Sequence, residues 1–388
     1  ERRHFARRQS AGRDGGTRPD PCYIPENEFR KLRTMIRMYR RVAGVGLALT
    51  MLVAGCGHSS STSQGPATSS TPVPSVATSS TRAASATSQA ARDLPDPHTL
   101  RGLTEVPELP DPKPVEGSSA QKLPVTVTDV EGNKVTIKST SRILALDLYG
   151  TLSRTLIGLG LGDKIVGRTV SSTEKQLHDR PVVTENGHVL NVEAVAGLKP
   201  SVIIADRSVG PKEALDQLRK SGIPVVLVDP HRSVGSTPQL IRTIADAVGK
   251  PDAGEALVKR TQEQIDQAKK QIAAWKPAKP MRVAFLYVRG NAGVFFILGS
   301  ENGASELIQG VGADDVASDK GITTLVPANA ESLVSINPDA IFVMRDGLAS
   351  TGGMKGLLAR AGVANTTAGR KQRVISIPDG ISLSFGPQ

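Results

Sequence analysis

The sequence contains little of what several common classes of protein need. Only two of its 388 residues are cysteine, which excludes a disulfide scaffold and a zinc site built from several thiolates. At most one stretch approaches the ~20 apolar residues of a membrane-spanning helix, so a multi-pass membrane protein is also excluded. Aromatic residues make up 3% of the chain, so each tyrosine can be weighed individually. The length allows one large domain or two ordinary ones.

The positive charge is concentrated near the amino terminus. The whole chain has a formal net charge of +11, but residues 1–55 hold 12 Lys/Arg against 5 Asp/Glu and account for +7 of it. A nucleic-acid-binding protein should carry such charge on its folded domain. We therefore expect no nucleic-acid partner.

The early part of the chain is typical of an exported protein. A basic Met38-Tyr-Arg-Arg41 precedes the uncharged apolar stretch 42–54, which is too short for a comfortable transmembrane helix. The stretch ends in Leu52-Val-Ala-Gly-Cys56, which resembles the bacterial lipobox. We predict a lipoprotein signal over 35–56 with lipidation of Cys56; the alternative is an ordinary signal with an incidental cysteine.

The flanking segments carry no folding pattern. Residues 1–34 are Arg-rich, lack periodicity and precede the first methionine, so they are interpreted as a non-native upstream extension. Residues 57–91 consist largely of small and polar residues and cannot bury enough apolar surface to fold. The Pro-rich residues 92–122 are expected to be irregular as well. We predict a tether over 57–122 and a folded part that begins near Leu123.

The folded part predicts parallel α/β structure. An Asn133-containing turn joins two alternating segments into a hairpin, and short apolar runs then alternate with helical patterns. The expected strands are 143–146, 202–205, 225–228, 283–286, 340–344 and 374–377. Residues 253–274 contain few helix breakers, which predicts one long, largely exposed helix. We expect two Rossmann-like lobes, 123–248 and 277–388, joined by that helix within 249–276.

Two segments repeat each other. Residues 191–204 and 329–342 both read as an Asn N-cap, a Glu in the first helical turn, a Pro stop and a buried strand. The repeat favours two similar lobes. By contrast, Gly158-Leu-Gly-Leu-Gly162 only superficially matches a dinucleotide fingerprint, because it follows a helix rather than a strand. No P-loop, nucleophile elbow or zinc-protease motif is present, so we expect no enzyme.

These features together resemble the substrate-binding proteins of bacterial ABC importers, in the rigid-helix subclass (class III) that carries siderophores, cobalamin and haem. The segments 159–167 and 198–204 are typical of that family, and the resemblance covers roughly residues 123–388. Glu185-Asn-Gly-His188 and Tyr287-Val-Arg289 resemble the haem-binding lipoproteins of Gram-positive haemin importers. The resemblance implies that His188 and Tyr287, one from each lobe, clamp the haem iron and that Arg289 supports the tyrosine.

The chemistry of these residues agrees with that role. Tyr287 ends an apolar run, and ligands in open α/β sheets bind beyond the carboxyl ends of strands. Arg289, two residues on, faces the same way on extended chain, and a guanidinium beside a phenol favours the phenolate that suits ferric iron. His188 follows an Asn-Gly turn and can supply the opposite ligand. The ordinary alternatives are a loop histidine and a buried, hydrogen-bonded tyrosine.

Other residues are weaker candidates. Tyr149 follows a predicted strand and either lines the cleft or simply packs, and His231 is a third possible iron ligand. Three arginines that follow strand ends are candidates for the haem propionates, and the sequence does not choose among them: Arg168, Arg207 and Arg345.

The repeated acids have two compatible interpretations. The resemblance implies that Glu193 and Glu331 dock onto arginines of the permease; otherwise they stabilise the positive ends of their helices. Family members also continue with a final helix after the residues that end this chain, so the second lobe is expected to be truncated.

We therefore expect a monomeric receptor, lipid-anchored at the extracellular face of the cell membrane, that delivers ferric haem to an ABC permease and its ATPase. The alternatives are a siderophore or cobalamin receptor of the same fold and, in a different class, a haem-dependent surface enzyme or sensor.

Overall fold

The computed structural model describes residues 94–116, 121–290 and 293–388, all within the unit Ala91–Gln388. The predicted upstream extension, signal peptide and Cys56, and the tether as far as residue 93, lie outside the described residues. Within the described ranges, every helix is too short or too polar to cross a membrane.

Four apolar runs form the sheet of the first lobe. Strands β4 (Ile143–Leu146), β5 (Ile165–Gly167), β8 (Val202–Ala205) and β9 (Val225–Leu227) are parallel in the order β5-β4-β8-β9. Alternate residues point to opposite faces, and both faces are covered. Ile143 and Ala145 join one hydrophobic cluster, while Leu144 and Leu146 join another. Burial on both faces explains why the strands are continuous apolar runs.

The two faces are covered by different helices. One cluster contains residues of α3 (Thr151–Gly158) and α6 (Thr237–Ala247), and the other contains residues of α4 (Val192–Gly197) and α5 (Lys212–Lys220). The predicted hairpin forms as β2 (Val125–Thr128) and β3 (Lys134–Ile137). The glycine cluster after α3 closes that helix, as expected: Gly160 has φ +79°, and Leu161 N donates to Leu156 O over 2.9 Å.

The second lobe is built on a larger, mixed sheet in the order β1-β15-β14-β10-β11-β13. Its parallel part contains β10 (Arg282–Arg289), β14 (Ala340–Met344) and β15 (Val374–Ile377), and β12 (Asp314–Asp315) pairs with the start of β10. Strands β11 (Val294–Ile297) and β13 (Val326–Pro327) add antiparallel pairs. The helices are α8 (Ala304–Gly310), α9 (Ala330–Ile336), α10 (Arg345–Ser350), α11 (Gly353–Leu358), α12 (Thr367–Lys371) and α13 (Asp379–Ser382).

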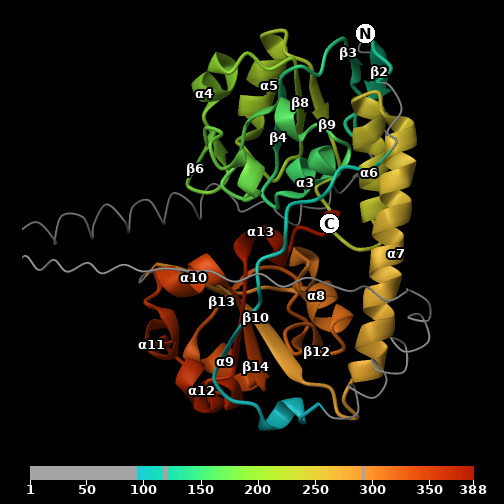
Figure 1. Ribbon diagram of the computed structural model, residues 1–388. Helices are drawn as coiled ribbons and strands as arrows, with labels where there is room; N and C mark the ends of the chain where they lie inside the picture. Colours follow the sequence, from blue (N-terminus) through green and yellow to red (C-terminus); the bar gives the residue numbers. More distant parts are fainter. Residues whose placement is uncertain (1–93, 117–120, 291–292) are drawn as a thin grey trace, which may run out of the picture. The chain divides into compact units, whose positions relative to one another are not determined.

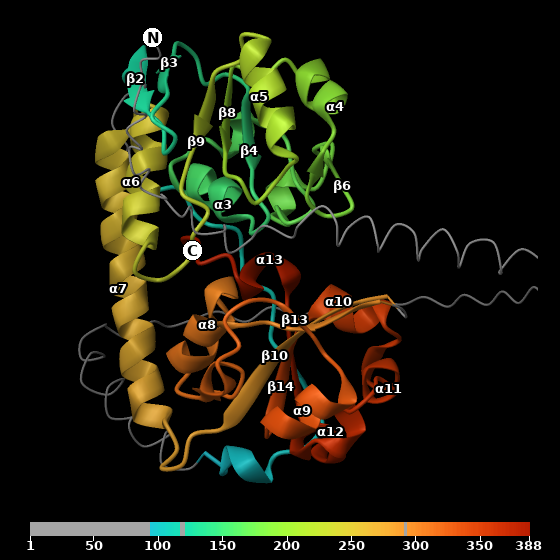
Figure 2. The same cartoon turned by 180° about the vertical axis from the view of Figure 1, so that it is seen from behind.

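The long helix predicted between the lobes is α7 (Pro251–Trp275), which runs beside both lobes in Figures 1 and 2. The buried residues of α7 lie in its first half, which packs on α6. Gly254 lies so close to Ala245 of α6 that a methyl group in place of its hydrogen would clash. Near its end, Ile272 lies beside Gly312 of the second lobe. The helix therefore packs into the first lobe and contacts the second.

The repeated segments fold alike, as predicted. Asn191 Oδ1 accepts the amide of Ala194 over 2.9 Å at the start of α4, and Asn329 Oδ1 accepts the amide of Ser332 over 2.8 Å at the start of α9. Each helix is followed by a buried parallel strand, β8 or β14.

The segment before the first lobe differs from the irregular tether that its composition predicts. Strand β1 (Leu103–Glu105) pairs in parallel with β15 at the edge of the second-lobe sheet. Further on, Asp111 accepts the amides of Lys175 and Gln176 in the first lobe over 2.9 and 3.0 Å, and Val115 enters the first-lobe core. The short, exposed β1 is held by backbone hydrogen bonds, so it leaves no apolar pattern in the sequence.

Replacing Asp111 with alanine should lower the free energy of unfolding by about 1–2 kcal/mol, because two backbone amides lose their carboxylate partner. Chemical denaturation checks this. The matched control is Asp163→Ala, which removes an exposed carboxylate that forms an ion pair with the adjacent Lys164. Equal stability of the two variants would contradict a structural role for residues 94–116.

Candidate functional site

Polar side chains gather where the first-lobe strands end. Asp147 follows β4, Arg168 follows β5, Asp206 follows β8, and Arg232 lies just beyond β9. Because the carboxyl ends of parallel strands meet at one edge of the sheet, all four lie along the same edge. This edge is where ligands of open α/β sheets bind.

A buried ion cluster lies beneath this edge. The Arg232 guanidinium pairs with Asp206 and lies 3.5 Å from an oxygen of Asp147, which also accepts the amide of Thr151 over 2.9 Å. One guanidinium thus serves two buried carboxylates. Burial raises the pKa of Asp206 to about 6, although Arg232 opposes the shift, and burial also raises the pKa of Asp147.

A second buried pair lies on α3 and the loop that faces it. Ser153 Oγ donates to Glu174 over 3.1 Å. Burial raises the pKa of Glu174 to about 7, while Arg154 and Ser153 act in the opposite direction. Arg154 donates to Pro387 O over 3.2 Å and to Gln388 Oε1 over 2.8 Å, so this group connects the first lobe to the end of the chain.

The lobes meet next to these charges. Thr151 Oγ1 donates to Ser384 O, and Thr237 Oγ1 donates to Phe385 O over 2.8 Å. The buried acids therefore lie directly under the contact between the first lobe and the segment that follows α13.

His188 lies on the turn of a short hairpin in the first lobe. Strands β6 (Thr184–Glu185) and β7 (Val189–Leu190) are joined through Asn186 and Gly187, whose φ values of 50° and 91° explain the Asn-Gly sequence. His188 is half-buried, and its backbone oxygen accepts a hydrogen bond from the amide of Gly210 over 2.9 Å. The turn is thereby fixed to the body of the lobe.

Tyr287 lies on β10 of the second lobe. The pairing of β10 with β14 ends at Leu286, so Tyr287 is the first residue beyond that parallel ladder and pairs with Phe296 of β11 instead. The Arg289 guanidinium carbon lies 5.0 Å from the centre of the Tyr287 ring, on the same face, as the i, i+2 spacing predicts. Arg289 in turn pairs with Asp379 over 2.5 Å.

The structure separates the two weaker ligand candidates. Tyr149 is half-buried, packs against a hydrophobic cluster of the second lobe, and has the Arg232 guanidinium 5.5 Å from its ring centre. It therefore spans the contact between the lobes. His231 is exposed, and its Nδ1 lies 2.9 Å from Asp229 Oδ1 in a local turn.

The candidate propionate arginines also differ. Arg207 pairs with Glu131 over 2.8 Å and Arg345 pairs with Glu108 over 2.5 Å, so both are already neutralised. Arg168 pairs with no carboxylate in the part of the chain that the structure describes, and it follows β5 beside the strands that carry His188. Of the three candidates, Arg168 is therefore the one whose charge the described residues leave without a carboxylate partner.

The repeated acids lie in matching positions. Glu193 is exposed in the first turn of α4, and Glu331 is exposed in the first turn of α9. Neither takes part in the ion clusters above, so both are available to a partner on the surface.

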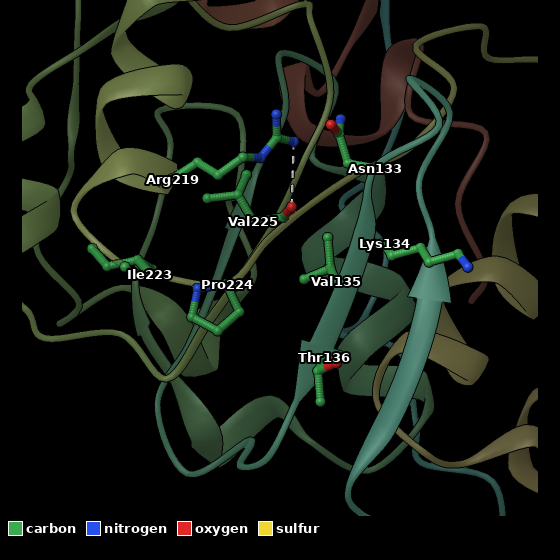
Figure 3. A pocket seen from close by; sticks show the side chains of 9 residues that line it. Asn133, Lys134, Val135, Thr136, Arg219, Ile223, Pro224 and Val225 are labelled. Atoms are coloured by element: carbon green, nitrogen blue, oxygen red, sulfur yellow. Dashed lines mark hydrogen bonds between the residues drawn. The ribbon is translucent and has the colours of Figure 1, made fainter.

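A concave surface elsewhere on the first lobe is distinct from this site (Figure 3). It is lined by Lys134, Arg219 and the start of β9 at Val225, and Arg219 donates to Val225 O over 3.4 Å. Val225 begins its strand, so this surface lies at the amino edge of the sheet, opposite the carboxyl edge described above.

The sequence patterns did not single out the buried acids Asp147, Asp206 and Glu174, nor Asp379. A signal existed for part of the cluster, because Asp147 and Asp206 each directly follow an apolar strand. No local signal marks Glu174 or Asp379, since their partners are distant in sequence.

The family model for the periplasmic binding proteins matches residues 148–380, and the chain belongs to this family. This confirms the predicted family and the predicted fold class of two α/β lobes.

Individual relatives and solved structures are similar to this chain over most of its length. The uncharacterised ABC transporter substrate-binding lipoprotein YvrC of Bacillus subtilis is 27% identical over 267 residues, 68% of this chain and 82% of YvrC. A cobalamin-binding protein of Halobacterium salinarum is 25% identical over 275 residues, 69% of this chain and 72% of that protein. The solved structure of the haem-binding protein HmuT is 49% identical and has a TM-score of 0.74, covering 76% of this chain and 95% of HmuT.

Glu174→Gln should change how stability depends on pH. The raised pKa of Glu174 in the folded state means that the folded protein holds the proton more tightly, so its ionisation costs stability as the pH rises from about 4.5 to 7. The unfolding free energy of the variant minus that of the wild type should therefore increase by about 2 kcal/mol as the pH rises from 5 to 8.

Denaturant titrations at several pH values measure this difference. The control is Glu263→Gln on the exposed face of α7, which should keep the wild-type pH dependence. A pH-independent difference between Glu174→Gln and the wild type would mean that Glu174 is not buried as the structure shows.

Proposed function

We propose that this chain is the substrate-binding component of an ABC importer that captures ferric haem between its two lobes and delivers it to the permease. The observation that carries the proposal is the pair of possible iron ligands, His188 on the first lobe and Tyr287 on the second, with Arg289 against the Tyr287 ring. The role is binding and delivery, and no catalysis is proposed.

The comparison with HmuT supports haem as the ligand. Solved HmuT variants replace one histidine, one tyrosine and one arginine. The arginine follows the tyrosine by two residues, as Arg289 follows Tyr287, and the histidine precedes the tyrosine by the same distance as His188 does here. The cobalamin-binding relative has a much lower identity, which places the cobalamin alternative second.

The ligand chemistry suits a receptor. Imidazole and phenolate are both axial ligands of haem iron, and the positive charge of Arg289 stabilises the anionic oxygen. Because the ligands come from different lobes, the bond to iron depends on the separation of the lobes. A permease that moves the lobes apart would break it.

The remaining parts of the proposal concern assembly. Lobes 123–248 and 277–388, joined through 249–276, act as the two halves of the clamp in a monomer. Glu193 and Glu331 offer one docking carboxylate on each lobe to a permease that works with its ATPase. Lipidation of Cys56 would hold the receptor at the extracellular face of the cell membrane, and the lipoprotein YvrC supports this placement.

Titrating haemin into soluble protein comprising residues 92–388 should give a saturable ferric spectrum. His188→Ala and Tyr287→Ala should each alter that spectrum and weaken binding at least tenfold, because each removes an axial ligand. The matched control is His178→Ala, which removes an exposed histidine of the same lobe that is not among the proposed ligands. A folded wild type without a specific haem band would rule out haem and leave a receptor for another chelate.

Replacing both Glu193 and Glu331 with glutamine should abolish haem-dependent growth of cells while leaving haem binding in solution unchanged. The substitutions keep the helices but remove the charges that a permease arginine would meet. Growth on haem and spectral titration measure the two effects separately. The control pair, Glu263→Gln and Glu301→Gln, changes the net charge equally at exposed positions. Unimpaired growth of the first variant would rule out the docking role.

A further inference from the structure

The guanidinium of Arg289 is held between an aromatic ring and an acid. Its carbon lies 5.0 Å from the centre of the Tyr287 ring, and its Nη2 lies 2.5 Å from Asp379 Oδ2. The same Nη2 lies 3.4 Å from the sulfur of Met344. Nη2 is thus held by Asp379 of α13 and Met344 of β14.

Asp379 is itself fixed. It follows β15 at the first position of α13, and only 16% of its side chain is exposed. Its Oδ1 accepts the amide of Asp346 at the start of α10 over 2.8 Å, which leaves Oδ2 for Arg289. The two oxygens have different partners, so the carboxylate cannot rotate freely.

The other terminal nitrogen of the guanidinium, Nη1, lies close to the backbone around Gly347. Arg289 Nη1 is buried without a hydrogen-bond partner among the described residues. It lies beside Gly347, where an added methyl group would come within 2.5 Å of Nη1 and equally close to Val288 O. A larger residue at position 347 would therefore push the guanidinium out of place.

We propose that Asp379 is a positioning residue: it holds the Arg289 guanidinium against Tyr287, and Gly347 provides the space. The inference rests on the proposed function, in which Tyr287 binds ferric iron through its phenolate oxygen. Without Asp379, the long arginine side chain, already one-third exposed, is free to leave the ring. The iron–phenolate bond then loses its neighbouring positive charge, and haem should dissociate faster.

The test compares haem dissociation rates and the phenolate-to-iron charge-transfer band in variants of the protein comprising residues 92–388. Asp379→Asn should speed dissociation about tenfold and shift the band, and Gly347→Ala should do the same with every charge retained. The control, Asp319→Asn, removes one charge from an exposed position of the same lobe and should match the wild type. Thermal melting of the apo proteins checks that each variant is folded.

A double-substitution cycle separates positioning from general support. If Asp379 acts through Arg289, then adding Asp379→Asn to Arg289→Ala should change nothing further. Additive effects, or a single Asp379→Asn variant that matches Asp319→Asn, would overturn the inference while leaving haem binding by Tyr287 intact.

The proposed function fails by a different result, namely a folded wild type whose spectrum lacks the charge-transfer band. Crystal structures of the apo wild type and apo Asp379→Asn then still decide the inference. A guanidinium that leaves the Tyr287 ring only in the variant supports it, and an unmoved guanidinium overturns it.

Discussion

Burial of the parallel strands on both faces of each sheet is the constraint on which the rest of this structure depends. The strands of the first lobe divide their side chains between two apolar clusters, and the second-lobe sheet does the same. A polar group that must meet a ligand is costly along the buried length of these strands. Ligand chemistry is therefore expected near the carboxyl ends of the parallel strands: His188 lies on the turn between β6 and β7, and Tyr287 lies on β10 just beyond its parallel pairing with β14.

The same constraint explains the charges beneath the contact between the lobes. A carboxylate that directly follows a buried strand, such as Asp147 or Asp206, can stay charged only with a partner, and Arg232 reaches both. These groups share their location with the contacts of Ser384 and Phe385 to the first lobe. The buried charges therefore lie where the two lobes contact each other directly. Helix α7 provides a separate connection between the lobes.

The sequence predicted the regular elements well and the long-range contacts poorly. The strands at 143–146, 202–205 and 340–344 coincide with apolar runs because two-sided burial makes such runs unmistakable. The turn before His188 was predictable from Asn-Gly, which favours positive φ.

Other features depend on partners far away in the chain. Strand β1 is added to β15 by backbone pairing and has no apolar pattern, so its composition suggests a tether. The pairing of Arg289 with Asp379 joins residues that no local rule connects, although the spacing of Tyr287 and Arg289 was informative. The choice among Arg168, Arg207 and Arg345 likewise required knowledge of which acids were nearby.

The central claim is that one ligand from each lobe binds the same iron. Anomalous diffraction at the iron edge from crystals of the haem-loaded protein tests it most directly. The account predicts a single iron peak between an imidazole nitrogen of His188 and the phenolic oxygen of Tyr287. An iron bound through one lobe only, or near Tyr149 instead, would contradict it.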